Sequence, residues 1–516
     1  MIDMLPPHVI QFLSLSASIF IFVIGMAMLG LICVFVYDVV QKRDSVLRNY
    51  PVVGHLRGGF THLGEFFRQY FFALDREEMP FNRAERDWVY KSAQGRDNTV
   101  AFGSTRSLTP VGTPIFVNAP FPPLDDETVD PPSIVFGPHA RRPYEAKSLI
   151  NVSGMSYGAI SRPAVLALSR GAKLAGCWMN TGEGGLSPHH LAGGADIVFQ
   201  IGTAKYGVRD ANGALSDEKL REIASHDQVR MVEIKLSQGA KPGKGGILPG
   251  GKVTAEIASI RGIPEGRDSL SPNRHTDIAS LGDLVDTINH VRDVTGLPTG
   301  IKTVIGDTAW LDELFAIVRA RGEQSAPDFI TVDSGDGGTG AAPMPLMDNM
   351  GLPIKESLPM VIGALERAGL RGRVRVAASG KLVTPAEIAW AYCAGADVVN
   401  SARGFMFALG CIQALKCNRN TCPTGITTHN PRLQRGLDPA DKAVRVKNYV
   451  EKVHKGVGII AHSCGVAHAR ELGPAHVRMV QPNGTSMTLE QIARAAEAGR
   501  PVNPIPAMHD GTRAAS

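Results

Sequence analysis

The fold is decided by the stretch DFITVDSGDGG at residues 328–338, because its pattern recurs along the chain. A short run rich in β-branched residues ends in polar residues and glycines, and a helical stretch follows. Seven other runs share this form: SLINVSGM (148–155), GCWMNTGEGG (176–185), DIVFQIG (196–202), MVEIKLSQG (231–239), TGIKTVIG (299–306), VRVAASGK (374–381) and ADVVNSARG (396–404). Strands that alternate with helices indicate βα units and a parallel sheet. Eight units in about 260 residues predict an α/β protein with a (β/α)8 TIM barrel.

The chain before this repeat begins with an apolar segment. No residue between Val9 and Tyr37 is charged, and a membrane span needs only roughly 20 apolar residues. Lys42, Arg43 and Arg48 follow, so the positive-inside rule predicts one transmembrane helix in the cytoplasmic membrane, with the catalytic body on the cytoplasmic side. A signal peptide and a buried core helix are the competing interpretations.

Four regions follow from this pattern. We expect an anchor at 1–45, a mixed region at 46–146, the barrel at 147–425, and a helical cap and tail at 426–516. A long glycine-rich excursion at 239–280 interrupts the barrel after its fourth strand, and excursions of that length are usually functional.

The composition excludes several classes of protein. Hydrophobic residues make up 44% and charged residues 20%, which argues against global disorder. The net charge is +5 and no run of six basic residues occurs, so we expect no nucleic-acid partner. Seven cysteines, with three close together, argue against a secreted disulfide framework and for a metal or redox centre.

Polar side chains gather at the predicted strand ends, where barrel enzymes have their active sites. Phosphate commonly binds between the loops after strands seven and eight, which here read SGK (379–381) and SARG (401–404). Gly380 and Gly404 would admit phosphate to the backbone and Arg403 would add charge, although both glycines could simply form turns. The strand ends carry Ser153, Met155, Ser156, Tyr157, Asn180, Glu183, Gln200, Lys235, Lys302, Asp333, Ser379 and Ser401.

Two lysines stand inside apolar strand patterns, Lys235 in VEIKL and Lys302 in GIKTV. A buried lysine is costly unless it is paired or faces a ligand. A flavin would benefit from such a charge, because its reduced form is negative near N1. The alternative is a lysine that extends from a strand end into solvent. The motif GDGGTG (335–340) fits GxGxxG, but Pro343 and Pro345 spoil the helix start that a dinucleotide site needs, so we interpret it as an active-site loop.

The clustered cysteines are Cys411, Cys417 and Cys422, and Pro423 follows the last of them. Thiolates on short irregular loops hold iron–sulfur clusters, and a proline after the last cysteine recurs there. Three thiolates fit a three-iron cluster with one thiolate per iron, whereas zinc prefers four ligands. His429 is a candidate fourth ligand.

Five blocks in a fixed order resemble the FMN-binding synthase domain of glutamate synthase. They are SGMSYGAIS (153–161), NTGEGG (180–185), EIKLSQGAKPGKGGILPGGKV (233–253), DGGTGAAP (336–343) and GCIQALKCNRNTCPTGI (410–426). The resemblance spans about residues 147–465. It implies a (β/α)8 barrel with FMN at its C-terminal face, a 3Fe-4S cluster on the three cysteines, and reduction of the imine of 2-oxoglutarate and ammonia to L-glutamate.

The resemblance also implies roles for individual residues. Glu183, Lys241 and Arg261 match positions that meet the keto acid. The loop residues Ser153, Gly154, Met155, Ser156 and Tyr157, together with Gln200 and Lys302, would contact the flavin ring. Ser379, Gly380, Ser401, Arg403 and Gly404 would hold its phosphate. We expect Lys235, Asp333, Gly337 and Gly338 beside the same cofactor.

The chain departs from bacterial glutamate synthase in its first residues, which read as a membrane anchor, so we expect no glutaminase domain in this chain. We therefore expect ammonia or another amine from solution or from a separate amidotransferase subunit, and electrons from a donor protein. The loop SPNRHTDIAS (271–280) departs from the family version, which puts the substrate in question. The alternatives are an N-alkylglutamate synthase or other amino-acid FMN oxidoreductase, and a non-catalytic, membrane-tethered electron-transfer subunit.

Overall fold

The computed structural model describes residues 6–41, 45–67, 71 and 74–497. The chain divides into two compact units, Met1–Arg83 and Ala84–Ser516. In the first unit, helix α1 (Pro7–Val40) is 34 residues long with a mean hydropathy of 3.0 in its most apolar window, enough to span a membrane by length and composition. Helices α2 (Ser45–Asn49) and α3 (Gly54–Phe67) follow, and Asp38 pairs with His55 at 2.9 Å.

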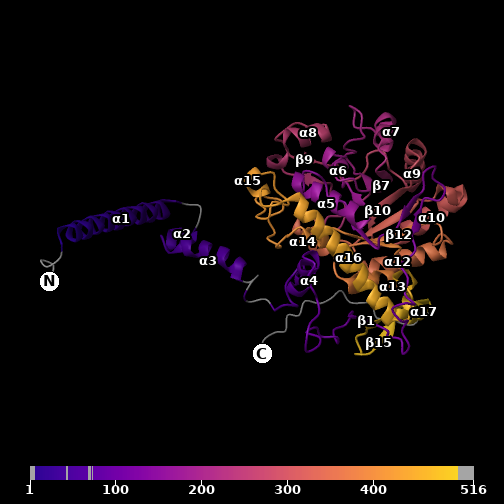
Figure 1. Ribbon diagram of the computed structural model, residues 1–516. Helices are drawn as coiled ribbons and strands as arrows, with labels where there is room; N and C mark the ends of the chain where they lie inside the picture. Colours follow the sequence, from indigo (N-terminus) through magenta and orange to yellow (C-terminus); the bar gives the residue numbers. More distant parts are fainter. Residues whose placement is uncertain (1–5, 42–44, 68–70, 72–73, 498–516) are drawn as a thin grey trace. The chain divides into compact units, whose positions relative to one another are not determined.

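The second unit is built on a closed barrel of eight parallel strands (Figure 1). Each predicted run overlaps one strand, so the barrel prediction is confirmed. The strands close in the order β4-β5-β6-β7-β10-β11-β12-β13. Their bounds are β4 (Ile150–Val152), β5 (Met179–Asn180), β6 (Ile197–Ile201), β7 (Val229–Lys235), β10 (Thr299–Val304), β11 (Phe329–Asp333), β12 (Arg375–Ser379) and β13 (Val398–Ser401).

Helices surround the barrel and begin at the caps that the sequence offers. Ser161 accepts a hydrogen bond from the Ala164 amide at the start of α5 (Arg162–Ala175), and Gly176 ends that helix in the left-handed conformation. The other helices along the barrel are α6 (Pro188–Leu191), α7 (Asp217–Ser225), α9 (Leu281–Thr295), α10 (Ala309–Arg321), α12 (Ile354–Arg367), α13 (Pro385–Cys393) and α14 (Arg403–Ala408).

A hairpin of β2 (Ile134–Phe136) and β3 (Tyr144–Ala146) closes the N-terminal end of the barrel. Phe136 is fully buried, and its ring meets those of Trp178 and Phe329 edge-on, with centroids 5.6 and 5.7 Å apart. The same cluster contains residues from five strands: Val198, Met231, Phe329, Ala377 and Val398. In the part of the chain that the structure describes, this cluster fills the N-terminal end of the barrel.

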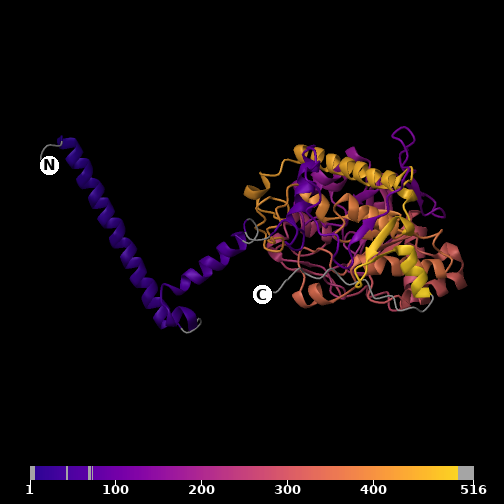
Figure 2. The same cartoon turned by 90° about the horizontal axis from the view of Figure 1, so that it is seen from below.

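The C-terminal region packs on the barrel mainly through α16 (Pro439–Ser463), which lies against α5 and runs along the outside of the barrel (Figure 2). The face of α16 that packs inward is buried at Val446, Tyr449, Val450 and Val453. The region expected to be helical also carries strands. β14 (Val477–Val480) pairs with β15 (Ser486–Thr488) and with the distant β1 (Pro114–Phe116), and α17 (Leu489–Glu497) follows.

Two loops at the open end have structure of their own. The excursion after β7 contains β8 (Ile247–Leu248), the 3₁₀ helix η3 (Gly250–Lys252), α8 (Ala255–Arg261) and β9 (Ser269–Leu270). The loop after β11 leads into a six-residue helix, α11 (Met344–Asn349), directly after Pro343. The expectation that two prolines prevent a helix start there is wrong, because proline is tolerated in the first helical turn, where its missing N–H has no partner to lose.

We predict that Phe136→Ala destabilises the barrel. Truncating a fully buried phenylalanine removes its packing and leaves a cavity, which costs about 3–5 kcal/mol. The measurement is the free energy of unfolding in urea. Phe121→Ala, at a ring that is 91% exposed, is the matched control and should stay within about 0.5 kcal/mol of the parent protein. Equal stability of the two variants would contradict the role of the hairpin as a plug.

Candidate active site

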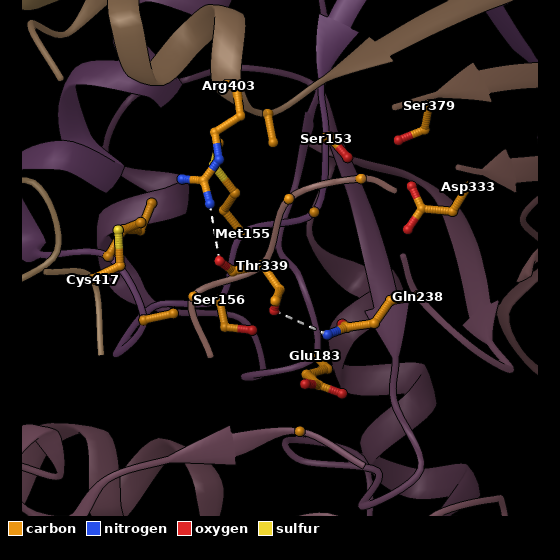
Figure 3. A pocket seen from close by; sticks show the side chains of 18 of the residues that line it. Ser153, Met155, Ser156, Glu183, Gln238, Asp333, Thr339, Ser379, Arg403 and Cys417 are labelled. Atoms are coloured by element: carbon orange, nitrogen blue, oxygen red, sulfur yellow. Dashed lines mark hydrogen bonds between the residues drawn. The ribbon is translucent and has the colours of Figure 1, made fainter. Parts of the chain in front are cut away.

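A cavity opens at the C-terminal ends of the strands and is drawn in Figure 3. It is formed by the loops after β4, β5, β11, β12 and β13 and by the excursion after β7. Many of the predicted site residues line it: Ser153, Gly154, Met155, Ser156, Glu183, Lys241, Arg261, Lys302, Asp333, Gly337, Gly338, Ser379, Gly380, Ser401, Arg403 and Cys417.

Glu183 lies at the centre of a group of cations. Its Oε2 is 2.9 Å from the Nζ of Lys235, which also donates to Gln238. Burial alone would raise the pKa of Glu183, but Lys235 outweighs it, helped by Lys241 and Arg261, so the pKa is lowered and the carboxylate is ionised. Burial lowers the pKa of Lys241 to about 8, partly opposed by Glu183.

Arg261 is held in place from behind. Its guanidinium donates to the Oγ of Ser269 at 3.2 Å and to the carbonyl of Tyr157 at 3.1 Å, and it lies over the ring of Tyr206. Its Nε is buried and has no protein partner among the described residues. A buried guanidinium with spare donor capacity next to a cavity is suited to bind a carboxylate.

The hydroxyl of Tyr157 donates to Glu256 in the first turn of α8, whereas its carbonyl accepts from Arg261 in the last turn. His189 Nε2 lies 2.7 Å from the other oxygen of Glu256. Tyr157 thus joins the loop after β4 to both ends of α8. Tyr157 itself is not among the residues that line the cavity.

The floor of the site is organised by Glu233, which is buried inside the barrel. Its carboxylate accepts from Asn180 at 2.8 Å, from Gln200 at 2.7 Å and from Thr331 at 2.6 Å. The backbone of Gly154 lies directly on this layer, since a Cβ there would come within 2.9 Å of Gln200 Nε2. Gln200 is therefore fixed below the loop that was predicted to contact a flavin.

Lys302 pairs with Asp333 at 3.3 Å, and Asp333 also accepts from the Gly239 amide at 2.8 Å. Burial would lower the pKa of Lys302, but Asp333 and Glu233 outweigh it and the pKa is raised. Lys302 therefore brings a fixed positive charge to the cavity, so the buried lysine that the sequence singled out is both paired and turned toward a binding space.

The loops after β12 and β13 form one end of the cavity, with Ser379, Gly380 and Lys381 on one side and Ser401 and Arg403 on the other. Gly380 has φ +135°, and a Cβ there would lie 2.1 Å from that of Ser334, so only glycine fits. In Figure 3, Arg403 reaches the carbonyl of Thr339 at 2.9 Å.

At this end of the cavity, Lys381 pairs with Asp336 at 2.9 Å. Gly404 does not line the cavity; it leaves room for Tyr449, whose hydroxyl would lie 2.1 Å from a Cβ at this position.

The cysteine loop borders the cavity at Cys417. Burial raises the pKa of Cys411. Burial would do the same for Cys422, but hydrogen bonds from Thr424 and Thr427 outweigh it and lower its pKa, which favours a thiolate. In the described part of the chain, no three His, Cys, Asp or Glu side chains converge on a single-ion site. The candidate fourth ligand His429 instead bonds the Gly158 carbonyl through Nε2 at 2.8 Å.

Several predicted residues do not line the cavity, although most of them contact residues that do or lie beside them in the chain. They are Tyr157, Gln200, Lys235, Gly404, Cys411 and Cys422. Sequence reasoning missed others, among them Glu233, Gln238, Thr339 and Lys381. Glu233 carried the same signal as Lys235, a charge inside the apolar strand pattern VEIKL. Gln238 and Thr339, which share a 3.3 Å hydrogen bond across the cavity, carried no signal of their own.

Comparison with known proteins identifies the family. The conserved region in glutamate synthase matches residues 123–467. The glutamate synthase large subunit-like protein YerD of Bacillus subtilis is 38% identical over 521 residues, which cover 93% of this chain and 98% of that protein. The archaeal glutamate synthase [NADPH] of Methanocaldococcus jannaschii is 38% identical over 303 residues, 58% of this chain and 56% of that one. The matched region is thus only about half of the archaeal relative.

A solved structure, the flavin-binding domain of baker's yeast flavocytochrome b2, aligns with a TM-score of 0.44 at 14% identity, covering 84% of this chain and 88% of that one. The family assignment rests on the sequence matches alone. These matches cover the whole barrel, its excursion and the cysteine loop, and therefore all the site residues described above. The chain belongs to the glutamate synthase family of oxidoreductases.

Proposed function

We propose that this chain is an FMN- and iron–sulfur-dependent oxidoreductase that reduces the imine of 2-oxoglutarate to L-glutamate. The observation that carries the proposal is the gathering of Lys235, Lys241 and Arg261 around Glu183 at the mouth of the barrel. A dicarboxylate would satisfy the excess positive charge, since one anion balances only one of three cations.

The two residues of the excursion have distinct roles in this proposal. Arg261, fixed by Ser269 and the Tyr157 carbonyl, binds one carboxylate, and Lys241 binds the other. Glu183 accepts or donates a proton of the amine or imine, because its carboxylate lies in the same cavity. The ammonium of Lys235, 2.9 Å away, is a proton donor to this carboxylate.

FMN fits the remainder of the cavity. The backbone at Gly154 presents a surface without a side chain above Gln200, Lys302 brings positive charge, and Arg403 and the Gly380 turn would hold a phosphate. When bound, FMN would supply the hydride that reduces the imine. The remaining residues expected beside it are Ser153, Met155, Ser156, Tyr157, Lys235, Asp333, Gly337, Gly338, Ser379, Ser401 and Gly404.

A 3Fe-4S cluster fits the chemistry of the three thiols on the cysteine loop. Each thiolate would bind a different iron atom, so the three sulfurs need not converge on one point. The thiol of Cys422 already receives hydrogen bonds from two threonines, an arrangement that favours a bound thiolate. The cluster on Cys411, Cys417 and Cys422 would pass electrons from a donor protein toward the flavin.

A second candidate function differs only in the amine. Ala159, Ile160, Ile247 and Leu248 give the cavity an apolar wall, which suits an alkyl substituent better than bare ammonia. An N-alkylglutamate synthase therefore remains the second candidate. A non-catalytic electron-transfer subunit is less well supported, since it would need no carboxylate-binding residues.

The test of function is reoxidation of the anaerobically reduced protein. We expect 2-oxoglutarate to restore the oxidised flavin spectrum with ammonium or with methylamine, and the faster amine distinguishes the two candidates. Arg261→Ala should raise the apparent Kd or KM for the keto acid roughly 30- to 1000-fold, because a buried charge-assisted contact is worth on the order of 2–4 kcal/mol.

In the same titration, keto-acid affinity should be full below pH 8 and fall as the pH rises through about 8, where Lys241 loses the proton that binds a carboxylate. Arg267→Ala, at an exposed arginine on the same excursion, is the matched control. It should change neither the keto-acid affinity nor the dependence of that affinity on pH. A reduced enzyme that ignores 2-oxoglutarate with either amine refutes both glutamate-forming functions.

Cofactor content is the second prediction. The purified protein should carry about one FMN and one three-iron cluster per chain, and Cys417→Ser should abolish the cluster signal while FMN remains measurable. The measurements are iron analysis, electron paramagnetic resonance and the flavin absorption. Cys177→Ser, at a buried cysteine far from the loop in sequence, should retain both cofactors. Stoichiometric zinc without iron would contradict the assignment.

Membrane attachment is the third prediction. We propose that α1 is a single-pass anchor with the barrel on the cytoplasmic side, since lysine and arginine follow the apolar segment. Deleting residues 1–45 should release a soluble protein that still binds FMN, because the barrel unit has its own core. Cell fractionation measures the release, and protease digestion of right-side-out vesicles should spare the barrel. An anchor that is cleaved off in the native protein would contradict the proposal.

A further inference from the structure

Lys252 is a buried lysine that the proposed function does not use. It ends η3 on the excursion and only 2% of its surface is exposed. Its Nζ donates to the carbonyl of Ala159 at 2.6 Å and to the carbonyl of Cys417 at 3.2 Å. The first carbonyl belongs to the loop after β4, which lines the cavity, and the second to the cysteine loop.

The charge of Lys252 has no carboxylate partner in the part of the chain that the structure describes. Among the described residues, no carboxylate forms an ion pair with it, and both of its hydrogen-bond partners are neutral carbonyls. Burying an ammonium without a counter-charge is costly, so such a group is stable only where an anion compensates it. The nearest candidate for that anion is whatever the cysteine loop holds, because the second carbonyl is that of Cys417 itself.

A neighbouring contact repeats the same connection. His429, seven residues after the last clustered cysteine, bonds the carbonyl of Gly158, next to the carbonyl that Lys252 bonds. The His429 amide also donates to the side chain of Asn420, which lies in the cysteine loop. The consecutive carbonyls of Gly158 and Ala159 are therefore each bonded to a residue that also contacts the cysteine loop. Lys252 is the one of the two that is cationic at pH 7.

We propose that Lys252 is a positioning residue that joins the cysteine loop to the loop after β4, and that its buried charge favours the reduced form of the iron–sulfur cluster. The inference rests on the proposed function, because it assumes that the three cysteines hold a cluster. A positive charge beside the loop that would hold the cluster stabilises the added electron, so the reduction potential should be higher than it would be without that charge.

The experiment is a reductive titration of the full-length holoenzyme with dithionite at pH 7, followed by electron paramagnetic resonance. Lys252→Met should lower the equilibrium constant for reduction of the cluster about tenfold. For a one-electron couple, this lowers the reduction potential by about 59 mV. Lys252→Gln, which keeps a donor for the carbonyls but no charge, should give a similar fall. Lys252→Arg should keep most of the parent potential.

The matched control is Lys244→Met, which removes the same charge from an exposed position on the same excursion and should leave the potential unchanged. A cluster that is intact in Lys252→Met or Lys252→Gln with the parent potential overturns the inference and leaves the proposed function standing. Loss of the cluster from both neutral variants but not from Lys252→Arg supports the positioning role. Parent protein that contains no iron overturns the proposed function itself.

Discussion

The ion pair between Glu183 and Lys235 is the contact on which the rest of the site depends. A carboxylate enclosed at the mouth of a barrel would become neutral if burial acted alone, and the ammonium 2.9 Å away keeps it charged. Because Glu183 follows β5 and Lys235 ends β7, the pair joins two strands that are not neighbours in the barrel. The charges of Lys241 and Arg261 then surround a carboxylate whose ionisation is already fixed.

The excursion after β7 concentrates the chemistry in a single insertion. Within about 20 residues it carries Lys241, Lys252 and Arg261, which face a cavity, a cysteine loop and the carbonyl of Tyr157. The barrel itself supplies the rigid layer below, where Glu233 fixes three neighbouring side chains. This division of labour is typical of barrel enzymes, in which loops set the reaction and strands provide the scaffold.

The barrel could be predicted because its signal is local. Each of the eight strands is a short apolar run that ends in polar residues and glycine, so a reader of the sequence meets the same unit eight times. The strand ends also named some of the residues that line the cavity, such as Glu183, Lys302 and Asp333. The pairing of β1 with β14 could not be predicted, because the two segments are short and lie far apart in the chain.

The same limit explains the missed side chains. Lys252 follows a glycine-rich run in which nothing distinguishes it from Lys244, and only the folded chain brings the carbonyls of Ala159 and Cys417 to its ammonium. The helix after Pro343 was missed for a local reason, since proline was treated as a breaker where it begins a helix.

The way Tyr157 holds α8 at both ends has a thermodynamic consequence. Its hydroxyl restrains the first turn and its carbonyl restrains Arg261 in the last, so the loop after β4 and the guanidinium at the cavity share one set of restraints. A ligand that orders this loop also lowers the entropy lost when a second ligand engages Arg261. Linkage makes such a coupling reciprocal, so a ligand held by Arg261 would favour a ligand on the loop after β4 by the same factor.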